Sequence, residues 1–154
     1  MKNIIQPIAV TMGDPSGIGI EVTLRAWKNR KIKHPFFLIH DYSYVKKIIK
    51  KMKINIPLKL ISEPNQAVKT YKNFLPIYQL EVAKNTHLGK PNKQNAKVIL
   101  KSIDMALKFI QSGEVAAMVT NPIAKNIINY ASKNFTGHTC LLYTSPSPRD
   151  HPRS

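Results

Sequence analysis

Three short segments of the sequence combine glycine, hydroxyl, amide and basic side chains in patterns that suit the binding of an anionic substrate. The first, residues 12–19, reads Met-Gly-Asp-Pro-Ser-Gly-Ile-Gly and separates an apolar run from a helical pattern. Glycines let the backbone approach a ligand closely, and a helix N-terminus presents unpaired N–H groups to an anion. A tight turn with Asp14 or Ser16 capping the helix explains the same residues equally well. The spacing matches neither a P-loop nor the dinucleotide-binding glycine pattern.

The second segment, residues 120–125, reads Thr-Asn-Pro-Ile-Ala-Lys and directly follows the apolar run 115–119. In open α/β sheets, ligands bind at the carboxyl ends of the strands, so polar side chains are well placed here. We therefore group Asp14, Asn121 and Lys125 as a possible active-site loop. A helix cap formed by Thr120 or Asn121, with Lys125 on the surface, is the alternative.

The third segment contains Gly137, His138 and Thr139. A histidine at this point can serve as an acid, a base or a donor to an anion, although a lone histidine beside glycine is more often structural. The remaining histidines show no metal-ligand spacing with it, so no metal site is assigned within this chain; they are His34, His40, His87 and His151.

Strands alternating with helices must position these segments. Apolar runs predict strands at residues 7–11, 36–40, 58–61, 75–82 and 115–119. Pro76 either weakens the prediction of the fourth strand or places that strand at an edge of the sheet. Helical periodicity is expected from residue 18 and over 45–53, 66–74 and 92–111. The almost wholly apolar run 115–119 suggests a strand covered on both faces. The pattern favours an α/β fold with a largely parallel sheet.

The formal net charge is +16, which raises the alternative of a nucleic-acid-binding domain. The densest lysine cluster, residues 45–53, carries apolar residues at helical spacing, so its lysines are expected on a solvated helix face. We therefore expect neither a nucleic-acid nor a membrane partner.

Cys140 is the single cysteine, no apolar run approaches a membrane span, and no signal peptide is evident, so a cytoplasmic protein is expected.

Taken together, four motifs resemble the 4-hydroxythreonine-4-phosphate dehydrogenase family in order and spacing. They are Thr-Met-Gly-Asp-Pro-Ser-Gly-Ile-Gly at residues 11–19, Gly-Lys at 89–90, Val-Thr-Asn-Pro-Ile-Ala-Lys at 119–125 and Phe-Thr-Gly-His-Thr at 135–139. Ile20 stands where the family usually has proline. The resemblance covers roughly residues 4–139.

The resemblance implies NAD-dependent oxidation of 4-phosphooxy-L-threonine, followed by decarboxylation to 3-amino-2-oxopropyl phosphate in pyridoxal phosphate biosynthesis. It implies a three-layer fold like that of isocitrate and isopropylmalate dehydrogenases, incomplete in this chain. It also implies a divalent metal (zinc, magnesium or cobalt), a homodimer, and substrate binding by His138 and Thr139. A related dehydrogenase of another phosphorylated hydroxy acid remains the alternative; the catalytic residue is not identified.

The resemblance ends at Cys140, where the family has glutamate. We therefore expect residues 1–140 to form the N-terminal portion of the dehydrogenase. Residues 141–154, rich in proline and serine, are expected to be a disordered and non-native tail that resembles translated adaptor sequence. The family's three metal-ligand histidines have no counterpart here, so the chain by itself is expected to be inactive.

Overall fold

The computed structural model describes residues 5–30 and 33–128. Within them a five-stranded sheet has the order β3-β4-β2-β1-β5, and every neighbouring pair is parallel. The strands are β1 (Ile8–Val10), β2 (Phe36–His40), β3 (Leu58–Ile61), β4 (Leu75–Gln79) and β5 (Ala117–Val119). The helices are α1 (Gly19–Asn29), α2 (Tyr42–Met52), α3 (Gln66–Thr70), α4 (Ala96–Gln111) and α5 (Lys125–Ile128), with a 3₁₀ turn η1 (Lys93–Asn95). The expected parallel α/β fold is confirmed.

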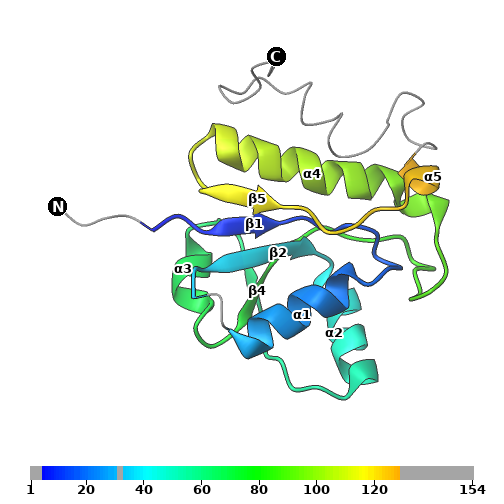
Figure 1. Cartoon of the computed structure of the whole chain (residues 1–154), viewed down its shortest axis with the longest axis horizontal. Helices are drawn as coiled ribbons and strands as arrows, with labels where there is room; N and C mark the ends of the chain where they lie inside the picture. The colour runs from blue at the N-terminus through cyan, green and yellow to red at the C-terminus, as the bar shows by residue number, and fades with distance from the viewer. Residues whose placement is uncertain (1–4, 31–32, 129–154) are drawn as a thin grey trace, which may run out of the picture.

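The sheet lies between two helical layers, with α4 along one face and α1 and α2 along the other (Figure 1). On the α4 face, Phe109 packs edge-on against Phe37 at 6.0 Å and against Tyr78 at 5.2 Å between ring centroids. Helix α4 buries Ile99 and Ile103, as the periodicity of residues 92–111 predicts, whereas Ile110 near its end is 37% exposed. The core of the described residues therefore follows the central strands, with helices on both sides.

Helix α2 confirms the interpretation of the lysine-rich segment. Val45, Ile48 and Ile49 are buried against the core, whereas the lysines of this helix are exposed. The helix begins three residues earlier than expected because Asp41 caps it, accepting a hydrogen bond from the N–H of Ser43 at 3.1 Å. No helix in residues 5–30 and 33–128 is long and apolar enough to cross a bilayer.

The expectation that Pro76 marks an edge strand is wrong, because β4 lies between β3 and β2. The N–H of Leu75 donates to Pro57 on the β3 side, at 2.9 Å. Successive backbone N–H groups of a strand point to opposite sides, so the nitrogen of Pro76 faces β2. The register with β2 begins only at Ile77, paired with Leu38, so the missing N–H falls before the paired part of the strand.

The last strand also differs from expectation. The apolar run 115–119 forms a strand only at Ala117–Val119, and β5 is an edge of the described sheet. Met118 packs against the core, but Val119 is 51% exposed. The expected covering on both faces is therefore wrong for the described residues. The hydrophobicity of residues 115–119 predicted that both faces of this strand are buried. Hydrophobicity does not specify which helix or strand packs on each face.

Candidate active site

The two loops that carry the sequence motifs meet at one end of the sheet. After β1 the chain passes to β2 on one side, and it returns on the other side of β1 as β5 (Figure 1). The carboxyl ends of β1 and β5 therefore flank a topological switch point, where open α/β sheets form their ligand crevices. Residues 11–18 follow β1 and residues 120–124 follow β5, so the first two motifs lie side by side at this end of the sheet.

The two loops are in direct contact through Gly13. Its φ is +64°, and a Cβ added there would lie 2.5 Å from Asn121 Cβ and 2.8 Å from the carbonyl oxygen of Pro122. The N–H of Asp14 donates to that same carbonyl at 2.8 Å. Only glycine combines this backbone conformation with so close an approach. The glycine of the motif is therefore explained by contact between the loops, without a bound ligand.

Asn121 holds the junction from the other side. Its side chain is buried, and its Nδ2 donates to Thr11 O at 3.0 Å and to Thr23 Oγ1 at 3.1 Å. The Thr23 hydroxyl in turn donates to Gly19 O at 2.9 Å. Both amide hydrogens of Asn121 thus have protein partners. The side chain ties the end of β5 to the end of β1 and to the first turns of α1.

Asp14 shapes the loop of residues 11–18, which we call the glycine loop. Its Oδ1 accepts the N–H of Ser16 at 2.9 Å, and its carbonyl accepts the N–H of Gly17 at 2.9 Å. These bonds form the tight turn that the sequence analysis gave as an alternative. The prediction that Asp14 or Ser16 caps the helix is wrong, because the N-cap residue of α1 is Ile18 and no side chain caps the helix. The hydroxyl oxygen of Ser16 is buried with no hydrogen-bond partner among the described residues. The carbonyl of Ser16 accepts the N–H of Gly89 at 2.8 Å.

Two residues beside this loop escaped sequence reasoning. The hydroxyl of Tyr44 donates to the carbonyl of Pro15 at 2.6 Å. The ring of His40 stacks on the ring of Tyr44, with 5.7 Å between the ring centroids. Burial, with the nearby charge of Asp14, raises the pKa of Tyr44 to about 12. Burial lowers the pKa of His40 to about 4, against the opposing effect of Asp41. A histidine at the end of a predicted strand, four residues before a tyrosine, was the available signal.

The remaining candidates are placed only in part. Lys125 is the first residue of α5 and so follows the junction directly. His138 and Thr139 lie outside the described residues, as does the segment 141–154, whose origin stays a prediction. Within residues 5–30 and 33–128, no group of three or more histidine, cysteine, aspartate or glutamate side chains could hold a metal ion.

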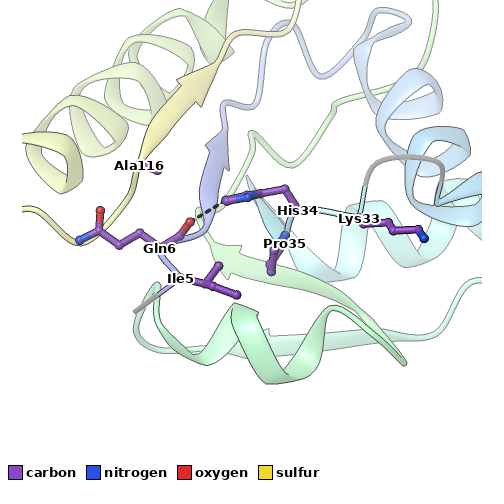
Figure 2. Close-up of a pocket in the computed structure, with 6 residues that line it drawn as sticks. All are labelled: Ile5, Gln6, Lys33, His34, Pro35 and Ala116. Carbon is purple, nitrogen blue, oxygen red and sulfur yellow. Dashed lines mark hydrogen bonds between the residues drawn. The ribbon is translucent and has the colours of Figure 1, made fainter. Parts of the chain in front are cut away.

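A cavity of about 460 Å³ lies at the opposite end of the sheet and is lined by Ile5, Gln6, Lys33, His34, Pro35 and Ala116. These residues precede β1, β2 and β5, so they mark the amino ends of the strands. Figure 2 shows His34 directed toward Gln6, whose carbonyl oxygen lies 2.7 Å from His34 Nε2. The cavity contains none of the motif residues, and we assign it no part in the candidate active site.

Comparison with known proteins agrees with the motifs. The family model described as pyridoxal phosphate biosynthetic protein PdxA matches residues 31–149. A 4-hydroxythreonine-4-phosphate dehydrogenase from Methylorubrum populi is 36% identical over 141 residues, covering 89% of this chain and 40% of that protein. One from Zymomonas mobilis is 32% identical over 137 residues, covering 88% of this chain and 39% of that protein. The chain thus spans about two fifths of the length of these curated relatives.

Solved structures show the same fold. A 4-hydroxythreonine-4-phosphate dehydrogenase from Klebsiella pneumoniae superposes with a TM-score of 0.79 at 23% identity, over 90% of this chain and 44% of that one. One from Burkholderia phymatum gives 0.79 at 20% identity, over 94% and 46%. The expected dehydrogenase-like fold, incomplete in this chain, is confirmed. Since the family model matches most of the sequence, the chain belongs to the family of the pyridoxal phosphate biosynthetic protein PdxA.

Proposed function

We propose that this chain forms the part of a 4-hydroxythreonine-4-phosphate dehydrogenase that brings the substrate-binding segments to the switch point. The whole enzyme oxidises 4-phosphooxy-L-threonine with NAD, and the product loses carbon dioxide to give 3-amino-2-oxopropyl phosphate. The observation that carries the proposal is the junction between the glycine loop and Asn121 at the carboxyl ends of β1 and β5.

In this proposal the chain's own residues mainly position the substrate. The junction fixes where residues 120–128 leave the sheet, and this segment leads along the chain toward His138 and Thr139. These two side chains would bind the substrate, because charge-assisted hydrogen bonds hold anionic groups well. Rigid strand ends supporting such a segment would keep the reacting group in place, which is a large part of catalysis.

When bound, NAD would supply the hydride acceptor for the proposed reaction, and a divalent metal would supply the positive charge that polarises the substrate hydroxyl. The described residues hold no cluster that fits the metal, so no step is assigned to a metal bound by this part of the chain. A homodimer that completes the site, and a cytoplasmic location suited to a single cysteine, belong to the same proposal.

A chimera tests the function. The matching segment of the Zymomonas mobilis relative is replaced by residues 5–139 of this chain, and NADH formation with 4-phosphooxy-L-threonine is followed after a thermal melt has shown a folded protein. The chimera is expected to turn over. Replacing His138 by alanine and Thr139 by valine within it should lower kcat/KM at least tenfold, about the effect of losing charge-assisted hydrogen bonds to an anion.

The 154-residue chain by itself, with zinc or magnesium added, is the matched control and is expected to form no NADH. Turnover by that chain would contradict the expectation that the metal site lies outside it. A folded chimera without turnover would contradict the proposed function.

A further inference from the structure

The amino end of the sheet carries a second cavity, of about 410 Å³, lined by Arg30, Lys33, Pro35, Val68, Tyr71 and Lys72. Three of these six residues are cationic, and none is acidic. Residues 30–35 precede β2 and residues 68–72 precede β4, so the cavity lies at the opposite end of the strands from the junction of Gly13 and Asn121.

Arg30 is held in one orientation. Its guanidinium carbon lies 4.2 Å from the centroid of the Trp27 ring, and its Nη1 donates to Lys72 O at 3.1 Å. The Trp27 indole is itself fixed, since its Nε1 donates to Tyr71 O at 2.9 Å. A guanidinium has five N–H donors, and one carbonyl engages only one of them. Stacking and one hydrogen bond therefore fix the group while leaving donors for a ligand.

The residue type at position 30 is itself unusual. Arg30 ends α1 with φ at 37°, in the left-handed region where helices ordinarily place glycine. The chain contains twenty lysines and only four arginines, so composition would favour lysine at a basic position. A strained position occupied by the rarer cation suggests that the planar guanidinium has a role here.

Within the part of the chain that the structure describes, none of these three cations forms a salt bridge. Among residues 5–30 and 33–128, the salt bridges join Arg25 to Glu21 and Lys108 to Asp104, and neither involves the cavity. Lys33 lines both this cavity and the neighbouring one of about 460 Å³, and in Figure 2 its side chain extends away from Gln6 and Ile5. Pro35, Val68 and the buried Tyr71 supply an apolar wall.

We propose that this cavity binds a small phosphorylated molecule with an apolar body, at a site separate from the candidate active site. The phosphate would meet the free edge of the Arg30 guanidinium and the ammonium groups of Lys33 and Lys72, because charge-assisted bonds to phosphate are the strong ones. The apolar body would lie against Pro35 and Val68. A volume of about 410 Å³ is within the range of small-ligand pockets.

Trp27 is the only tryptophan in the chain, and it lies under Arg30, so its fluorescence reports on the site. Phenyl phosphate and inorganic phosphate are titrated into the 154-residue protein at constant ionic strength, with calorimetry as a second readout. We expect saturable binding that is at least threefold tighter for phenyl phosphate. Lys72→Gln, which changes an exposed side chain, should weaken binding about fivefold to tenfold, as the loss of one charge-assisted bond would.

Lys50→Gln on α2 is the matched control, since it removes the same charge from an exposed position away from the cavity. It should leave the affinity unchanged. Arg30→Lys keeps the charge and removes the planar fork, and should also weaken binding about fivefold. Equal weakening in Lys50→Gln and Lys72→Gln would reduce the effect to general attraction by a protein of charge +16 and overturn the proposal. An unsaturated titration, or equal affinity for the two phosphates, would do the same.

Discussion

Gly13 and Asn121 are separated by more than a hundred positions in the sequence, yet a Cβ on Gly13 would lie 2.5 Å from Asn121 Cβ. Gly19, at the start of α1, meets the same side chain, because its added Cβ would lie 2.8 Å from Asn121 Cβ. Two glycines of one motif thus close around one asparagine of another. The two segments therefore pack as one unit at this end of the sheet.

Replacing Gly13 by alanine is expected to destabilise the protein by about 2–4 kcal/mol, from overpacking against Asn121 and from strain at positive φ. Chemical denaturation measures the free energy of unfolding. Gly113→Ala is the matched control, since Gly113 has φ +77° and no atom within 4 Å of the added Cβ. That variant should lose only about 1 kcal/mol. Equal losses in the two variants would mean that the loops do not approach this closely.

Asn121→Asp is expected to lower the free energy of unfolding by about 3 kcal/mol at neutral pH. The substitution replaces the donating amide by a carboxylate oxygen facing Thr11 O, leaving buried polar groups without donors. Thr23→Val removes the other acceptor of this amide, together with the bond from Thr23 to Gly19, and should lose about 1–2 kcal/mol. A double-mutant cycle checks the link. Strictly additive losses would show that Asn121 and Thr23 do not act through their hydrogen bond.

Much of the fold could be predicted because hydrophobic periodicity is a local signal. The lysine helix and the stripe of α4 followed directly from spacing. The position of Pro76 in an inner strand could not be predicted. A proline is accommodated there because the pairing of β4 with β2 begins only at the next residue, Ile77. Register is a relation between distant segments, and strand composition does not encode it.

The candidate site was predictable to a similar extent. Ligands bind at the carboxyl ends of strands in open α/β sheets, and this rule identified residues 120–125 as a candidate site. It did not reveal that the Asn121 amide binds Thr11 and Thr23, because an asparagine in a motif looks the same whether it binds a ligand or the backbone. His40 and Tyr44 were missed because their stacking joins a strand to the following helix.

Tyr44→Phe should destabilise the protein by about 1 kcal/mol, since it leaves the buried carbonyl of Pro15 without the hydroxyl donor at 2.6 Å. The matched control is Tyr42→Phe in the same helix, because the hydroxyl of Tyr42 makes no hydrogen bond within the described part of the chain. Urea denaturation of both variants checks the difference. A Tyr44→Phe protein as stable as Tyr42→Phe would show that the glycine loop does not depend on this contact.

His40 should make the stability of the protein depend on pH. Its side chain is fully buried, its Nδ1 accepts the N–H of Asp41 at 2.8 Å, and its Nε2 has no partner among the described residues. Burial lowers its pKa from 6.5 to about 4. The unfolded chain therefore binds the proton first as the pH falls, and the contribution of neutral His40 is lost between pH 6.5 and about 4. The loss should reach about 3 kcal/mol, since each pKa unit corresponds to about 1.4 kcal/mol.

The prediction is tested by comparing the pH profile of unfolding free energy with that of His40→Asn, whose side-chain oxygen can still accept from Asp41 N–H. Carboxylates titrate in both proteins, so the difference between the two profiles isolates His40. That difference should shrink steadily as the pH falls below 6.5 and level off near pH 4. Parallel profiles for wild type and His40→Asn would show that His40 takes up its proton equally well in the folded and the unfolded protein.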